Sequence, residues 1–154
     1  MQTTWLEKQD LLVQGMTGMA PRQFVVVQYD VGLDPNPYAQ AAPEPDASWY
    51  CEVVSAHFLP QASWPIDYYY LWQHDWEAPD RAGENWARSA DSAEEAAALL
   101  VNALTHGRLC RDASRMVYEI GRWSDGPGGG EPHPFPEDPT TGELFPAGPF
   151  LLAA

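Results

Sequence analysis

Apolar residues recur at helical spacing most clearly in the segment after Asp91. Ser92 and Glu95 match the capping box that opens many helices. Alanine and leucine at positions 93, 96, 97, 100 and 104 then fall on one helical face. Gly107 follows at the place where a C-cap glycine is typical. The pattern predicts a helix over residues 93–106 that carries acidic residues at its N-terminus, where the helix dipole favours negative charge.

A second helix is predicted near the start of the chain. Thr4 and Glu7 match another capping box. Apolar residues then repeat at helical spacing at positions 5, 12 and 16, with positions 6 and 13 beside them. The glycines and the proline of residues 15–22 break the pattern. We therefore expect a helix over residues 5–15.

The aromatic segment 63–76 allows two interpretations. Pro65 suits the first turn of a helix, which would run over residues 65–74 and place Tyr68, Leu71 and Trp72 on one face. The alternative is an extended aromatic run, because three consecutive tyrosines also favour a strand. The helix is the favoured interpretation.

Strands are predicted where β-branched and aromatic residues cluster or alternate. They cover residues 23–31, 48–55, 84–89 and 115–123, and in the last of these Met116, Tyr118 and Ile120 share one face. Residues 32–47 hold four prolines and no apolar periodicity, so they are predicted to be a long connection without a strand. The strands at 23–31 and 48–55 are therefore predicted to pair directly, as a hairpin with a long Pro-rich tip.

The element order predicts an α+β fold with a mainly antiparallel twisted sheet and helices packed on one of its faces. We expect one domain over residues 1–123. Residues 124–154 are dominated by glycine, proline and acids, which predicts a tail that does not fold alone. Its apolar side chains offer a means of docking it on the domain or on a partner: Phe135, Leu144, Phe145, Phe150 and Leu151.

Charge excludes some classes of partner. The net charge is -14, from 8 Lys and Arg against 22 Asp and Glu. Such a surface repels phosphate backbones and anionic lipids, so we expect neither nucleic-acid nor membrane binding. A DNA-mimicking decoy for a basic protein is compatible with the charge. Many of the acids lie in predicted loops rather than along one face, which argues against it.

The N-terminus lacks the basic and apolar regions of a signal peptide, which favours a cytoplasmic protein with reduced thiols. The two cysteines, Cys51 and Cys110, have no spacing that demands a disulfide.

No segment has the pattern of an active site. The GPGGG stretch lacks the lysine of a phosphate-binding loop. His74, Asp75 and Glu77 are too few and too irregularly spaced for a closed metal site. Ser55 and His57 have no third residue to orient the histidine. Cys51 has no cationic neighbour and is expected in the core. We expect a protein without catalytic residues, metal or cofactor.

The aromatic segment is the strongest candidate for function. A single helix face cannot bury all of its rings, and Trp and Tyr are common anchors of protein interfaces. The candidate partner-binding residues are Trp64, Tyr68, Tyr69, Trp72 and Trp76. Two alternatives are that these rings form the core and a sealed rim, or that they line a small-ligand pocket.

Three phrases resemble a known family: WYCEVVSAHFLP (49–60), HDWEAPDRAGENWARS (74–89) and AEEAAALLVNAL (93–104). They are similar to actinobacterial TY-chaperone domains of the type III secretion chaperone-like superfamily. The sequence departs from the family pattern at His74 and Asp75, where Leu-Gly is common, and in its Pro-rich insertion.

The resemblance implies a compact α+β domain that binds protein segments and performs no chemistry. Secretion chaperones of the superfamily are usually homodimers, so a homodimer is one candidate assembly. The leading hypothesis is a non-enzymatic, chaperone-like or adaptor domain that holds a partner polypeptide. The alternatives are an acidic decoy of a basic protein and a structural subunit of a larger assembly.

Overall fold

Helices and the strands of a single sheet follow one another along the chain. The computed structural model describes residues 5–19, 23–80, 84–122 and 143–145. Its helices are α1 (Trp5–Thr17), α2 (Tyr68–Gln73), α3 (Ala93–Asn102), a π-helical turn η1 (Ala103–Gly107) and a 3-10 turn η2 (Ala113–Arg115). Its strands are β1 (Gln23–Tyr29), β2 (Tyr38–Pro43), β3 (Trp49–Val53), β4 (Trp86–Ala90), β5 (Met116–Arg122) and β6 (Glu143–Phe145).

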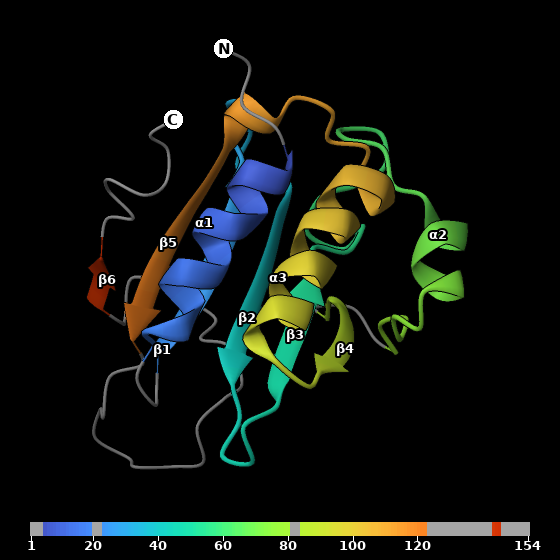
Figure 1. Cartoon of the computed structure of the whole chain (residues 1–154). Helices are drawn as coiled ribbons and strands as arrows, with labels where there is room; N and C mark the ends of the chain where they lie inside the picture. Colours follow the sequence, from blue (N-terminus) through green and yellow to red (C-terminus); the bar gives the residue numbers. More distant parts are fainter. Residues whose placement is uncertain (1–4, 20–22, 81–83, 123–142, 146–154) are drawn as a thin grey trace.

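The strands form one sheet in the order β4-β3-β2-β1-β5-β6, and every neighbouring pair is antiparallel. Helices α1 and α3 lie side by side across the same face of this sheet (Figure 1). The predicted α+β class and the antiparallel sheet are therefore confirmed. The segment at 86–90 is a strand, as expected, and lies at the end of the sheet, where the backbone of Ala87 pairs on the outer side with that of Glu77.

The prediction for residues 32–47 was wrong, because this segment contains β2. The strand lies between β1 and β3, so the segments at 23–31 and 48–55 do not pair directly. Residues 44–47 make the short turn into β3, in which Ala47 has a φ of 74°. The prolines lie at or outside the ends of β2, where they remove no central ladder hydrogen bond.

Small side chains let α3 approach the sheet closely. Ala39 and Ala41 of β2 are fully buried beneath the helical face that carries Ala96 and Ala97, which are also fully buried. Larger side chains from the neighbouring strands, such as Val27 of β1, fill the space around this contact. The core therefore forms between α1, α3 and one sheet face, as the periodicities at 93–104 and 116–120 predicted.

Helix α1 turns a stripe of Lys8, Leu12 and Met16 toward the core. The expected positions Leu12 and Met16 are confirmed, whereas Leu6 is 66% exposed. Lys8 was not expected inside. Its burial lowers the pKa of the ammonium group. The expected cap at Thr4 lies outside the described residues.

Helix α3 begins as predicted and ends differently. The Ser92 side chain accepts a hydrogen bond from the backbone N–H of Glu95 at 3.1 Å. At the other end the chain widens into the π turn η1, which finishes at Gly107. Leu109, not Gly107, has a left-handed conformation, with a φ of 56°. The glycine is needed for space, because a Cβ at position 107 would lie 2.7 Å from Cδ2 of Leu71.

Three residues of the predicted tail, β6, pair with β5 between Ile120 and Arg122. The other apolar tail residues named above lie outside the described part of the chain. The division into a domain over 1–123 and a tail over 124–154 stays a prediction.

Substituting Gly107 by alanine should destabilise the fold. The added methyl group would overlap Leu71, and overpacking of this kind costs about 1–3 kcal/mol. The measurement is the free energy of unfolding in urea. Gly18→Ala is the matched control, because nothing lies within 4 Å of its Cβ position. Equal stability of the two variants would contradict the close contact.

Both cysteines are free and buried, and burial raises the pKa of Cys51 and of Cys110 to about 12. An unfolded thiol has a pKa of about 8.5. Because the folded value is the higher one, the contribution of the thiols to stability is complete below about pH 8.5 and is lost as the pH rises toward 12.

We therefore expect a thiol reagent such as DTNB to react with neither cysteine of the native protein at about pH 8. We also expect stability in urea to fall between about pH 8.5 and pH 10. The double variant Cys51→Ala/Cys110→Ala should show a shallower fall. Rapid labelling of the native protein, or identical slopes for the two proteins, would refute this account.

Candidate functional site

Helix α2 displays aromatic rings to solvent. Tyr68 is 45% exposed, Tyr69 63% and Trp72 69%. These three residues are called the α2 patch below. They are half of the large hydrophobic residues that are exposed in the described part of the chain, the others being Leu6, Leu33 and Phe58. Tyr69 and Trp72 contact each other, with ring centroids 6.3 Å apart. A concentration of exposed rings in one helix is typical of a binding surface.

The other two candidate residues lie elsewhere. Trp76 is 3% exposed and belongs to the core, so it cannot contribute to a docking surface in this structure. Trp64 is partly buried, and its indole N–H donates to the backbone carbonyl of Arg108 at 2.6 Å. Tyr68, Leu71 and Trp72 were expected on one helical face, and of these three only Leu71 is buried. The structure thus brings together three of the five candidate residues.

Tertiary contacts fix the position of α2. Its helical conformation confirms the favoured interpretation, but the N-cap is Asp67, two residues after Pro65. The Asp67 side chain accepts from the N–H of Tyr70 at 3.0 Å, and its own N–H donates to the carbonyl of Gly107 at 2.7 Å. At the C-terminal end, Arg88 of β4 donates to the carbonyl of His74. Both ends of the helix are therefore tied to the rest of the domain.

Arg108 is fully buried beneath the segment that leads into α2. Its guanidinium donates to the carbonyl of Leu59 at 2.8 Å and to that of Trp64 at 3.3 Å. Burial lowers the pKa of Arg108 to about 10, so the side chain still carries its charge at neutral pH. This residue links the end of α3 to the connection between β3 and α2.

A pocket of about 460 Å³ lies beside α2. Its apolar walls are Trp5, Tyr70 and Leu109, and its polar groups are Asp67, Thr105, His106 and Arg111. Three separate parts of the chain supply these residues, which is why no local pattern predicted the pocket. The sequence did hold one signal. Within an acidic chain, Arg108, Arg111 and Arg115 place three of the eight Lys and Arg residues close together in the sequence.

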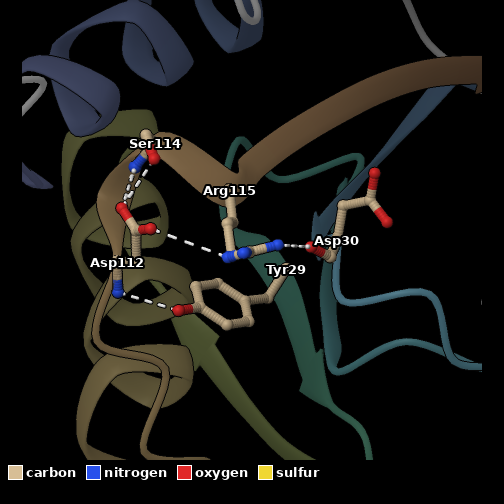
Figure 2. A network of polar contacts seen from close by, with 5 residues as sticks. All are labelled: Tyr29, Asp30, Asp112, Ser114 and Arg115. Atoms are coloured by element: carbon tan, nitrogen blue, oxygen red, sulfur yellow. Dashed lines mark hydrogen bonds and ion pairs between the residues drawn. The ribbon is translucent and has the colours of Figure 1, made fainter.

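Hydrogen bonds fix the segment that follows the pocket, as Figure 2 shows. The phenol of Tyr29 accepts from the N–H of Asp112 at 2.8 Å, and Arg115 donates to the carbonyl of Asp30 at 3.2 Å. Hydrogen bonds from Ser114 lower the pKa of Asp112. The ring of Tyr29 also stacks on Trp5, with centroids 6.3 Å apart. One tyrosine therefore joins a wall of the pocket to the segment that carries Arg111.

The residues considered above as possible catalytic or metal-binding groups do not form such a site within the described residues. The Ser55 hydroxyl donates to the carbonyl of Glu84 at 2.7 Å, and its contact with His57 is to the backbone N–H, not to the ring. Cys51 is fully buried, as expected of a core residue. Within the described ranges, no three His, Cys, Asp or Glu side chains lie close enough together to hold a metal ion.

The sheet face opposite α1 and α3 carries a polar network that the sequence did not predict. Glu52 accepts from Gln40 at 2.8 Å, from the Tyr50 phenol at 3.3 Å and from Asn85 at 3.3 Å. Burial and the nearby Glu52 carboxylate raise the pKa of Tyr50 to about 12. These three hydrogen bonds connect β2, β3 and the segment before β4 on this face of the sheet.

None of the helices in the described residues has the length and apolar character needed to cross a membrane.

Comparison with protein-family models gives a match over most of the chain. Residues 1–118 match the model of a family described as TY-Chap3, "T3SS (YopN, CesT) and YbjN peptide-binding chaperone 3". No curated protein and no solved structure matches the chain. The family match covers β1 to β4, the start of β5, the three α-helices and every residue of the α2 patch and of the pocket. The chain belongs to the TY-Chap3 family of peptide-binding chaperones.

Proposed function

We propose that this protein holds an extended segment of a client polypeptide against the α2 patch. The observation that carries the proposal is the exposure of Tyr69 and Trp72 on a helix whose ends are fixed. Trp and Tyr are the side chains that most often dominate binding energy when a partner covers them. The peptide-binding description of the family supports the same conclusion.

The anchoring of α2 makes the patch a preformed surface. Leu71 is fully buried against Gly107, and the Asp67 cap holds the first turn. A client therefore meets rings whose backbone is already ordered, and binding costs little conformational entropy on the chaperone side. Two packed rings suit apolar client side chains without requiring one particular sequence.

Charge favours a basic client. Acidic residues flank the patch in the chain at Asp67, Asp75, Glu77 and Asp80, and the protein as a whole carries a net charge of -14. Lysine or arginine beside the apolar client residues would be attracted by this surface, and clusters of client acids would be repelled. The proposed client segment is thus apolar and basic, and no chemical reaction is involved.

Trp72→Ala should weaken client binding about tenfold or more while leaving stability nearly unchanged, because the ring is exposed in the free protein and covered only in the complex. The measurement uses fluorescein-labelled peptides that combine Phe and Leu with Lys, titrated by fluorescence polarisation, together with urea unfolding. Leu6→Ala is the matched control, since Leu6 is 66% exposed but lies on α1. Equal losses for the two variants would remove the α2 patch from the site.

Binding through the α2 patch should persist in salt. Between about 0.1 M and about 1 M NaCl the Debye length falls from about 10 Å to about 3 Å, which screens charges but not apolar contacts. We expect the affinity for the same peptides to fall less than about fivefold. An affinity that collapses over this range, and that does not depend on Trp72, would support an acidic decoy in place of a chaperone.

A further inference from the structure

We propose that the pocket beside α2 binds the C-terminal residue of a client, with the terminal carboxylate on Arg111. The inference rests on the proposed peptide-binding function and names one part of its ligand. Tyr70 lines the pocket and belongs to the same helix as the α2 patch. The helix that carries both the patch and Tyr70 has six residues and is about 9 Å long.

Arg111 supplies an unused cation. The other arginines with described side chains donate to backbone carbonyls: Arg88 to His74, Arg108 to Leu59 and Trp64, and Arg115 to Asp30. Within the described part of the chain, Arg111 has no such partner, and it lines the pocket. Its planar guanidinium matches a carboxylate, with which it can form two parallel hydrogen bonds. Because the Asp67 carboxylate also lines the pocket, the attraction of a client carboxylate depends on the charge of Arg111.

Thr105 supplies an unused hydroxyl. Its Oγ1 is buried and has no hydrogen-bond partner in the described structure, although buried polar groups are almost always paired. Rotation about the Cα–Cβ bond would turn this hydroxyl into the pocket without breaking a protein hydrogen bond. A carboxylate bound at Arg111 would give the Thr105 hydroxyl an acceptor.

The backbone around the pocket is held in an unusual conformation. Thr105 and His106 belong to the π turn η1, and Leu109 has a φ of 56°, which a leucine rarely adopts. Hydrogen bonds from Arg108 N–H to Ala103 and from Cys110 N–H to Leu104, each 2.9 Å, maintain it. Such strained positions cluster at ligand-binding sites. Here the conformation places the side chains of Thr105, Leu109 and Arg111 around one cavity.

The remaining residues fit the rest of a chain-terminal residue. Trp5 and Tyr70 offer aromatic walls for an apolar or aromatic side chain. One oxygen of Asp67 caps α2, and the carboxylate can also accept the amide N–H that joins the last residue to the client. A terminal residue has this N–H, an adjacent carboxylate and a side chain. A free aromatic acid lacks the N–H.

The test compares N-acetyl-L-tyrosine with N-acetyl-L-tyrosinamide, which differs only in the carboxylate. Binding to the full chain is followed by two-dimensional ¹H–¹⁵N NMR, using the amides of residues 105–111 and the indole N–H of Trp5. A ligand this small should bind with a dissociation constant on the order of millimolar. We expect the acid to bind about fivefold or more tightly than the amide, and Arg111→Gln to abolish that difference.

Arg115→Gln is the matched control, because it removes the same charge outside the pocket and should preserve the difference. Equal binding of acid and amide, no binding of either, or equal effects of the two variants would overturn the proposal. A third probe, 3-(4-hydroxyphenyl)propionate, lacks the amide N–H. If it binds as tightly as N-acetyl-L-tyrosine, the ligand is a free aromatic acid and a chain terminus is excluded.

These probes do not cover the α2 patch, so Trp72→Ala should leave their binding unchanged. Failure of the pocket test therefore leaves the peptide-binding proposal intact. If Trp72→Ala leaves peptide binding unchanged while the pocket probes behave as expected, client binding at the α2 patch is contradicted and ligand binding in the pocket is not.

Discussion

The position of the proposed binding surface depends on one buried cation. Arg108 leaves water completely and bonds to two carbonyls of the connection that precedes α2, while Trp64 donates back to the Arg108 carbonyl. Burying a guanidinium is costly unless hydrogen bonds compensate for its lost hydration; here Nη2 has both acceptors, while Nε and Nη1 are buried without a hydrogen-bond partner in the described structure. Gly107, one residue earlier, receives Leu71 from α2. Adjacent residues of one turn thus set both the approach to α2 and its packing.

Most of the fold was predictable because local signals and tertiary packing agree. The capping box at Ser92 and the alternation around Tyr118 lie where the structure has α3 and β5. The strand β2 was missed because alanine has little intrinsic preference for a strand and the flanking prolines indicate a loop. Its conformation comes from hydrogen bonds to β1 and β3 on either side, and its alanines are required by α3 above them. Neither the pairing with β1 and β3 nor the packing against α3 can be recognised from the sequence of β2 alone.

The candidate site was predictable in location and not in detail. Composition identified the aromatic segment, but it could not separate exposed Trp72 from buried Trp76, because both are large rings four positions apart. The separation arises where Asp75, with a φ of 64°, reverses the chain after α2 and directs Trp76 into the core. The pocket was invisible for a different reason. It brings Trp5 together with residues that lie more than sixty positions further along the chain, and no sequence periodicity indicates contacts at such separations.

The shortness of α2 has a consequence for how the protein is made. Six residues do not hold a helix in water, so the helix exists only through contacts with Arg88, Gly107 and the segment fixed by Arg108. Arg88, Gly107 and Arg108 are all synthesised after α2. On the ribosome, Tyr69 and Trp72 have emerged well before the parts that order them. A partly synthesised chain therefore carries the aromatic residues of the α2 patch without the ordered helix that presents them. The binding surface forms only when folding of the chain is nearly complete.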